Sequence, residues 1–216
     1  MVAPVLYMVK EGMKEALTEF VRNGGILITT FMSGIVNESD NVYLGGYPGP
    51  LRELAGVWVE EIDALAPEQT NKITFADGTS STCSLLCDLM HLEGAQCVAS
   101  YESNFYAGTP AITKNQYGKG YTYYIGTNPT EGGIAKVLDI AVQTAGVTSV
   151  VTEATGLEIT CRKTDRYTYY FIFNFKDKVL PLPERFVGAV DLLTGEAIPE
   201  GCHMKQYDAL LVGVAN

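Results

Sequence analysis

Histidine is scarce in this sequence, and cysteine follows no metal-binding pattern. The two histidines, His91 and His203, lie far apart along the chain. The five cysteines are an odd number with wide spacings: Cys83, Cys87, Cys97, Cys161 and Cys202. Three residues separate Cys83 from Cys87, whereas redox and zinc-ribbon motifs use a CxxC spacing. We therefore expect small buried thiols in a reducing cytoplasm, with no metal centre and no cofactor.

Clustered positive charge and long apolar runs are missing as well. Fifteen basic and 25 acidic side chains give a formal charge of −10, and the basic residues occur singly. Nucleic-acid surfaces need clustered lysine and arginine, so no nucleic-acid partner is expected. The longest apolar run, residues 2–9, has about eight residues, whereas a membrane-spanning helix needs about 20. Met1 is followed by neither a basic segment nor a small-residue cleavage site, so we expect no signal peptide and a cytoplasmic protein.

What is present is the composition of a globular protein of one or two domains, with 47% apolar and 19% charged residues. The apolar run at 2–9 predicts a strand buried on both faces. A segment with apolar residues at helical spacing follows, and two glycines end it: Met13, Leu17, Phe20, Val21, Gly24 and Gly25. The next apolar run, 26–31, is again typical of a strand. These three segments predict a βαβ unit.

The middle of the chain is less regular. We expect a short helix at 51–56, a strand at 57–62, a strand running into an Asp-Gly turn at 71–81, a short helix followed by a strand at 84–101, and a strand at 118–127. The segment 130–147 predicts a helix with one apolar face: Ile134, Val137, Leu138 and Ala141. Strands alternating with helices indicate an α/β domain with a parallel sheet.

Beyond Gly146 the helical period disappears. Short strands separated by turns are expected at LEITCRK, YTYYFIFNF, VGAVDLL and ALLVGV. This pattern is typical of a small antiparallel β domain. We place the domains at 1–147 and 148–216.

The stretch GGYPGPLRELAGVWVEE, residues 45–61, resembles a phosphate loop that ends in catalytic acids. Two prolines each remove a backbone donor, and neither GK[ST] nor GxGxxG is present. Glu60 and Glu61 are adjacent, and neighbours on a strand point to opposite faces, so they cannot flank one glycosidic bond as a pair. We interpret the stretch as a rigid loop, a short helix and a strand.

Two further segments are candidate sites. The turn after residues 26–31 holds Ser33 but no cysteine, no GxSxG motif and no His-x-Glu downstream, so it predicts neither an amidotransferase nor a serine hydrolase. The turn-rich segments near 102–120 offer four side chains that could bind a ligand: Tyr101, Tyr106, Lys114 and Lys119. Packed turns are the simpler interpretation. No nucleophile, base and orienting group can be assembled, so we predict no catalytic residue.

Several long segments resemble a known family. They are APVLYMV, EFVRNGGILITTFMSGIVNESDNVYLGGYPGPLRELAGVWVEEIDAL and YESNFYAGTPAITKNQYGKGYTYYIGT, with the tail from YYFIFNFKDK to LLVGV. They look like the non-catalytic part of bacterial β-galactosidases of glycoside hydrolase family 42. The resemblance covers nearly the whole chain, and its most specific part is SGIVNESD together with residues 45–61.

The resemblance implies a fold and an assembly. In that family, a (β/α)8 barrel carries two catalytic glutamates, a flavodoxin-like, amidotransferase-like domain builds a trimer, and a small antiparallel β domain ends the chain. The barrel has no counterpart here, and Glu60 and Glu61 match the oligomerisation domain. The first strands of that domain also have no counterpart, so we expect the strand at 2–9 to form a parallel edge open to edge-to-edge association or swapping.

Three functions follow as alternatives. The first is a non-catalytic oligomerisation and accessory fragment of a β-galactosidase, whose galactoside substrate belongs to the full-length parent. The second is an amidotransferase-like domain without the usual catalytic residues. The third is a carbohydrate-binding domain that stacks sugars on Tyr47, Trp58, Tyr101 or Tyr106. We favour the first, with Tyr47, Arg52 and Trp58 as candidate contacts between the subunits of a homo-oligomer, a trimer in the family.

Overall fold

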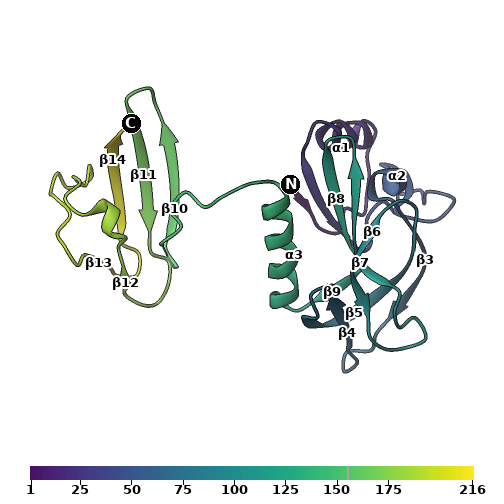
Figure 1. Cartoon of the computed structure of the whole chain (residues 1–216). Helices are drawn as coiled ribbons and strands as arrows, with labels where there is room; N and C mark the ends of the chain where they lie inside the picture. Colours follow the sequence, from purple (N-terminus) through teal and green to yellow (C-terminus); the bar gives the residue numbers. More distant parts are fainter. Residues whose placement is uncertain (155) are drawn as a thin grey trace. The chain divides into compact units, whose positions relative to one another are not determined.

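The computed structural model describes residues 1–154 and 156–216 (Figure 1). The chain divides into two compact units, Met1–Gly146 and Val147–Asn216. No helix among the described residues has both the length and the hydrophobicity needed to cross a membrane.

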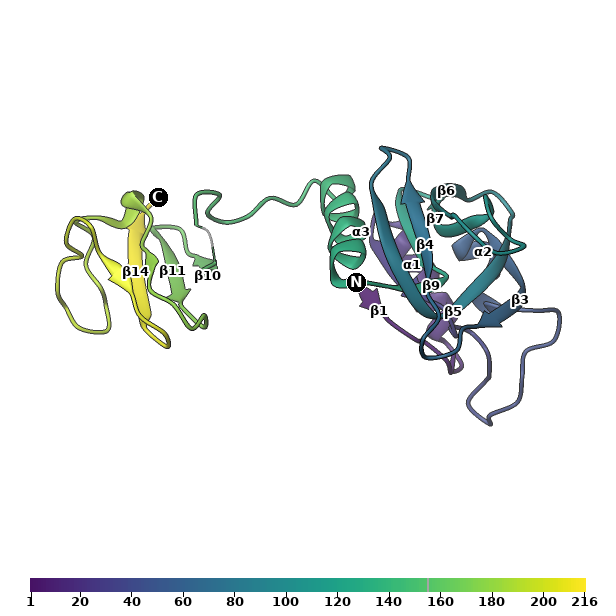
Figure 2. The same cartoon turned by 90° about the horizontal axis from the view of Figure 1, so that it is seen from below.

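The first unit is built on one mixed sheet, whose described strands run in the order β1-β2-β8-β7-β6-β4-β5-β3, with β9 paired to β5. The strands are β1 (Val2–Ala3), β2 (Ile26–Thr30), β3 (Val57–Ala64), β4 (Asn71–Phe75), β5 (Ser80–Leu92), β6 (Gln96–Tyr101), β7 (Pro110–Tyr117), β8 (Gly120–Ile125) and β9 (Thr127–Pro129). The helices are α1 (Met13–Arg22), η1 (Gly49–Leu51), α2 (Arg52–Ala55) and α3 (Glu131–Thr144). In Figures 1 and 2, α2 and α3 lie at opposite sides of this unit.

Parallel pairing joins β1 to β2 and β2 to β8, and the other ladders of this sheet are antiparallel. The predicted fold class, an α/β domain followed by a small antiparallel β domain, is confirmed. The parallel part of the sheet is narrower than expected, because hairpins build β4 to β8. A hairpin needs a short turn, whereas each parallel pair needs a crossover.

The predicted βαβ unit is present as β1, α1 and β2. Helix α1 ends as its glycines predict, because the N–H of Gly24 bonds to the Val21 carbonyl and that of Gly25 to the Phe20 carbonyl, each at 2.9 Å. This 5→2 and 6→1 pair is a Schellman motif, and Gly24 takes the left-handed φ of 106° that the motif needs. Leu17 and Val21 turn into the core, as their spacing predicts.

The strand predicted at 2–9 is wrong in length and in burial. Pairing covers Val2–Ala3, and Val2 is 57% exposed. Pro4 has no N–H to continue the ladder, and Val5 turns the backbone with a φ of 47°. β1 nevertheless lies at the end of the strand order, so the predicted parallel edge exists with two residues instead of eight.

The short helix predicted near residues 84–91 is also wrong, since β5 continues as a strand to Leu92. Leucine and methionine at 85–90 favour a helix by local propensity. β3 and β9 instead pair with this segment and take its backbone groups into ladders. Tertiary pairing outweighs a preference that is worth only tenths of a kcal/mol per residue.

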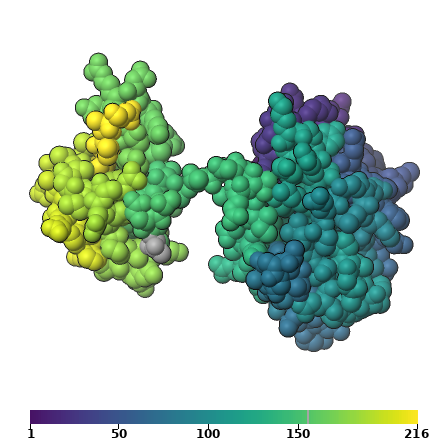
Figure 3. Space-filling view, viewed as in Figure 1, coloured from purple at the N-terminus to yellow at the C-terminus, as the bar shows by residue number. Residues whose placement is uncertain are grey.

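Helix α3 confirms the predicted helix but buries only half of its apolar face. Val137 and Ala141 are buried in the main core, whereas Ile134 is 39% and Leu138 38% exposed. α3 contacts β5 and β9, and its atoms lie at the surface of the unit in Figure 3. The core beneath the helix contains Tyr101 and Tyr123.

The second unit has an antiparallel sheet of β10 (Glu158–Lys163), β11 (Tyr167–Phe173) and β14 (Ala209–Ala215). A small pair of β12 (Leu180–Pro181) and β13 (His203–Met204) accompanies it, with η2 (Glu184–Phe186) between them. Its core is centred on Tyr170, Ile172, Phe186 and Val212. The strand predicted at 187–193 reduces to isolated bridges, because the buried Asp191 side chain accepts backbone N–H bonds from Leu193 and Leu211 in place of a ladder.

Candidate assembly surface

The loop before β3 is shaped by close backbone approaches. A Cβ on Gly34 would lie 2.2 Å from the Pro48 carbonyl oxygen, and one on Gly46 would lie 2.2 Å from Nε1 of Trp58. Both glycines also have a positive φ. Larger residues cannot occupy these positions without moving the loop. This agrees with the interpretation of residues 45–50 as a rigid loop.

Tyr47 fixes this loop to the sheet through its backbone and through the hydroxyl at the end of its side chain. Its backbone carbonyl accepts the N–H of Val59 at 2.8 Å. Its hydroxyl donates to Oδ1 of Asp88 at 3.1 Å. Tyr47 is half-buried and packs against the core cluster that contains Val57, Val59 and Tyr124.

Asp88 is a fully buried carboxyl group with two tyrosine donors. Tyr124 donates to its Oδ2 at 2.8 Å, and Tyr47 donates to its Oδ1. Burial raises the pKa of Asp88 from its ordinary 3.8 to about 7, because the charged form loses its hydration, although the two hydroxyl donors act in the opposite direction. Burial also raises the pKa of both tyrosines, so they remain neutral donors.

Arg52 projects from the first turn of α2 across the surface beside Tyr47. It forms a forked ion pair with Glu93, with Nε donating to Oε2 at 2.6 Å and Nη2 donating to Oε1. Its Nη1 donates to the Gly45 carbonyl at 3.0 Å. The two side chains of the ion pair remain 37% and 38% exposed. The bidentate geometry holds the guanidinium plane in one orientation.

Trp58 lies against that guanidinium. The Arg52 Cζ is 5.4 Å from the centroid of the indole, and the ring of His91 stacks on the indole at 4.9 Å with an interplanar angle of 21°. His91 Nε2 and Glu60 Oε2 are 2.6 Å apart. The buried Nε1 of Trp58 has no hydrogen-bond partner in the described part of the chain.

The structure therefore brings Arg52 and Trp58 together at β3, an edge strand of the sheet. Tyr47 joins the same strand through its backbone, while its ring packs against the core cluster that contains Val57 and Val59. Tyr47, Arg52 and Trp58 are all half-buried. We call them, with His91 and Glu93, the β3 surface. Sequence reasoning did not identify His91 or Glu93, because a separation of 41 residues between Arg52 and Glu93 leaves no local signal.

Glu60 and Glu61 do not follow the regular alternation expected of them. The pairing of β3 with β5 shifts between Val59 and Glu61, so a β-bulge interrupts the strand there. Both glutamates are exposed, and Glu60 faces His91. Because the bulge interrupts the alternation, strand geometry no longer requires the Glu60 and Glu61 side chains to point to opposite faces.

Four of the other candidate side chains are engaged within the unit: Ser33, Tyr101, Tyr106 and Lys114. Tyr101 and Tyr106 are 1% and 2% exposed, so the expectation that either ring serves as a sugar platform is wrong. Ser33 is fully buried and shares a 2.8 Å hydrogen bond with Thr29. The Lys114 ammonium lies 4.2 Å from the Tyr121 ring centroid, while Lys119 is exposed.

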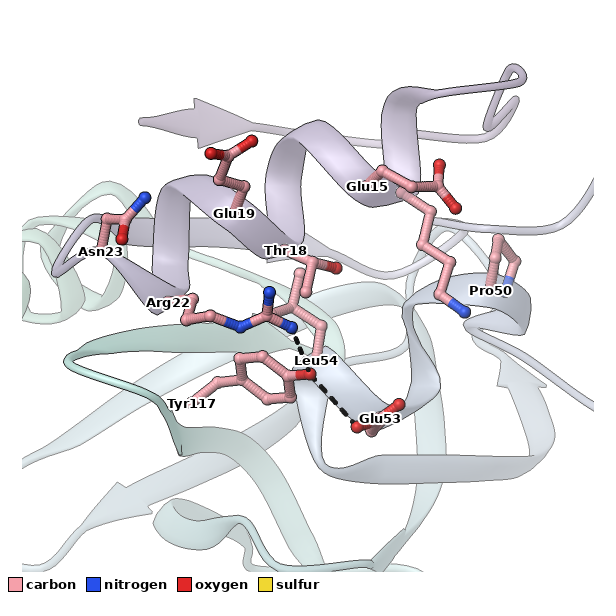
Figure 4. Close-up of a pocket in the computed structure, with 10 residues that line it drawn as sticks. Glu15, Thr18, Glu19, Arg22, Asn23, Pro50, Glu53, Leu54 and Tyr117 are labelled. Carbon is pink, nitrogen blue, oxygen red and sulfur yellow. Dashed lines mark hydrogen bonds between the residues drawn. The ribbon is translucent and has the colours of Figure 1, made fainter.

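A polar groove of about 460 Å³ separates α1 from α2 (Figure 4). At its base, Arg22 Nη2 donates to the Tyr117 hydroxyl at 3.4 Å, and that hydroxyl donates to Glu53 Oε1 at 3.2 Å. Lys14 and Glu19 add one charge of each sign to the lining. A lining with charges of both signs indicates no particular ligand. No group of three or more His, Cys, Asp or Glu side chains placed to hold a metal ion occurs in residues 1–154 and 156–216.

Residues 1–148 match the family model described as the β-galactosidase trimerisation domain. The chain belongs to the β-galactosidases of glycoside hydrolase family 42. Residues 156–212 match the β-galactosidase C-terminal domain of the same enzymes. The resemblance stated from the sequence is thereby confirmed, and the chain aligns with the trimerisation and C-terminal domains of the family.

Individual relatives agree with this assignment. β-Galactosidase LacA of Lactobacillus acidophilus is 49% identical over 196 residues, which cover 90% of this chain and 29% of LacA. BgaB of Geobacillus kaustophilus is 43% identical, over 85% of this chain and 27% of BgaB. The crystal structure of a β-galactosidase from Bacillus circulans sp. alkalophilus superposes with a TM-score of 0.88 at 36% identity, covering 98% of this chain and 32% of that one. The chain therefore spans about 30% of the length of the relatives that it matches.

Proposed function

We propose that this chain is a non-catalytic oligomerisation and accessory part of a cytoplasmic β-galactosidase. Residues 1–147 would form the assembly domain, and residues 148–216 a small accessory β domain. The match of residues 1–148 to a trimerisation domain carries the proposal and supports self-association. The hydrolysis of terminal β-D-galactosides would belong to the parent enzyme, with its two glutamates outside this chain.

The β3 surface supports a specific contact. Arginine, tyrosine and tryptophan are the residue types enriched where interfaces hold most of their binding energy. In the single chain, the ion pair with Glu93 already orients Arg52, and stacking with His91 already orients Trp58. Ordered side chains lose less entropy on association than mobile ones. We therefore propose that Tyr47, Arg52 and Trp58 contact a second copy of the chain.

The first prediction is that the chain forms a trimer through the β3 surface. In light scattering coupled to size exclusion, the full chain should give the mass of three copies, and Arg52→Ala should raise the dissociation constant at least about tenfold because a hot-spot arginine is lost. Arg162→Ala removes an exposed arginine on β10 and is the matched control. A monomer at high concentration would overturn the assembly proposal. A trimer that Arg52→Ala leaves unchanged would overturn the contact assignment.

The second prediction is that the chain alone neither hydrolyses nor binds galactosides. The purified chain should not hydrolyse a chromogenic β-galactoside above the rate in buffer, because no nucleophile, acid and base converge in the described residues. Calorimetry with galactose and lactose should likewise give no binding heat. Turnover that copurifies with the chain at constant specific activity would contradict the proposed function. Heat of binding without turnover would instead favour the carbohydrate-binding alternative.

A further inference from the structure

A bulge in β5 brings two cysteines together that the sequence separates by three residues. β5 pairs with β9 through Cys83 with Pro129, Ser84 with Asn128 and then Cys87 with Thr127. The register shift between Ser84 and Cys87 contains Leu85, whose φ is 73°. The bulge therefore absorbs two residues of β5.

The consequence is a short distance between the two cysteine backbones. Residues four apart on a regular strand lie about 13 Å apart, at about 3.3 Å per residue. Cys83 and Cys87 instead face positions two residues apart on β9, a spacing of about 6.6 Å. Disulfide-linked Cα atoms are usually about 4.4–6.8 Å apart.

The side chains of both cysteines are also buried. Cys83 and Cys87 belong to one core cluster, and the Cys87 sulfur lies 3.6 Å from the Thr127 hydroxyl. Cys83 is 1% and Cys87 0% exposed, and both belong to the main core. Both thiols therefore lie inside the unit, at neighbouring positions beside β9.

We propose that Cys83 and Cys87 form a redox pair that closes to an intramolecular disulfide in the folded chain. The oxidant is a low-molecular-weight disulfide. The thiolate of one cysteine attacks it, forming a mixed disulfide and releasing one small thiol. The second cysteine then attacks the mixed disulfide and releases the other small thiol. The pair loses two protons and two electrons in total, and the small disulfide is reduced to two thiols.

Cys87 is the attacking residue. The neighbouring Cys83 side chain lowers the pKa of the Cys87 thiol, although burial opposes this shift. The Cys87 side chain and burial raise the pKa of Cys83. One thiolate beside one thiol is the protonation state that thiol–disulfide exchange requires.

Access to the pair runs past Tyr106, in the turns between β6 and β7. Tyr106 belongs to the same core cluster as Cys87, and its hydroxyl donates to Asp63 Oδ2 at 2.6 Å. Loops open locally more readily than central strands do. Opening of residues 102–109 would uncover Cys87 while β5 stays paired with β3 and β4, so the oxidation occurs without global unfolding.

The test uses the full chain with Cys97→Ser, Cys161→Ser and Cys202→Ser combined, which leaves only the proposed pair. After incubation with oxidised glutathione, alkylation in denaturant followed by mass spectrometry should show two thiols lost and no bound glutathione. When Cys87→Ser is added, Cys83 has no partner, and no intramolecular disulfide can form. In this control, Cys83 should be found either alkylated or bound to glutathione. If the serine background fails to fold by circular dichroism, peptide mapping of the wild-type chain gives the same readout.

The proposal also predicts that the native fold promotes closure. The disulfide should form in the native chain at a glutathione ratio that leaves the same chain reduced in urea. A pair that stays reduced in the native chain, or that closes only in urea, would overturn the proposal. A persistent glutathione adduct on the native pair would do so as well, because the second thiol would then be unable to reach it.

Discussion

Gly120→Ala is expected to destabilise the first unit by more than about 3 kcal/mol, at the upper end of overpacking effects. A Cβ on Gly120 would lie 2.1 Å from the Gly25 carbonyl oxygen and 2.3 Å from that of Val21. Both oxygens belong to backbone at the end of α1 and the start of β2. Relief of the clash would therefore have to separate β8 from the α1–β2 connection, with loss of the Tyr121–Gly25 hydrogen bond.

Gly132→Ala is the matched control. This glycine lies in α3 at an ordinary helical φ, and a Cβ there would meet nothing within 4 Å. Alanine should stabilise the helix by about 0.5–1 kcal/mol. Urea unfolding of both variants, followed by circular dichroism at a fixed chain concentration, measures the difference. A Gly120→Ala chain as stable as the wild type would show that the backbone there moves at little cost.

Asp88→Asn is expected to stabilise the chain at pH 8 but not at pH 4. The folded-state pKa of Asp88 is raised above its unfolded value, so the folded chain holds a proton that the unfolded chain releases between about pH 4 and 7. The stability from this group is complete below pH 4 and is lost as the pH rises to 7. The loss amounts to at most about 4 kcal/mol, for about three pKa units at 1.36 kcal/mol each.

The amide that Asp88→Asn introduces would keep the hydrogen-bonding shape without the charge, so the variant should lack this decline. Asp191→Asn is the control with the opposite sign. Burial raises the pKa of Asp191, but the backbone donors at Leu211 and Leu193 outweigh it and lower the pKa overall. Its contribution is therefore present above pH 4 and is lost only in acid. Urea unfolding from pH 4 to 8 distinguishes the two, and parallel wild-type and Asp88→Asn curves would show that Asp88 stays ionised in the fold.

The same aspartate connects the core with the proposed assembly surface. The Tyr47 hydroxyl that holds the loop donates to Asp88. An ionised acceptor makes stronger hydrogen bonds than a neutral one. The hydrogen bond from Tyr47 to Asp88 therefore strengthens above pH 7, where the fold has already lost the stability that the protonated carboxyl group gives it.

Elements with a complete local signal could be predicted from the sequence. Helix α1 has apolar residues at helical spacing and two glycines at its end, and α2 ends at Gly56 with a φ of 65°. Strand β4 and its Asp-Gly turn have a local signal as well. In each case, the residues that signal the element or its end lie within it or directly beside it in the sequence.

Elements that depend on distant partners could not be predicted. Residues 84–91 favour a helix locally, yet β3, about 30 residues earlier, pairs them as a strand. The run at 2–9 has the composition of a central strand, yet it lies at the edge, where Val2, Val5 and Tyr7 stay exposed. The bulges beside Glu60 and at Leu85 follow from the register of the neighbouring strands.

The sequence by itself determined the family, the α/β unit followed by a β unit, and the absence of a recognisable catalytic motif. Each of these depends on residue types in a linear order. Only the tertiary structure decided that Arg52 pairs with Glu93, that Trp58 stacks with His91, and that Cys83 and Cys87 lie at neighbouring positions beside β9. The physical reason is that strand register sets which side chains face each other, and register is fixed by pairing between residues far apart in the chain.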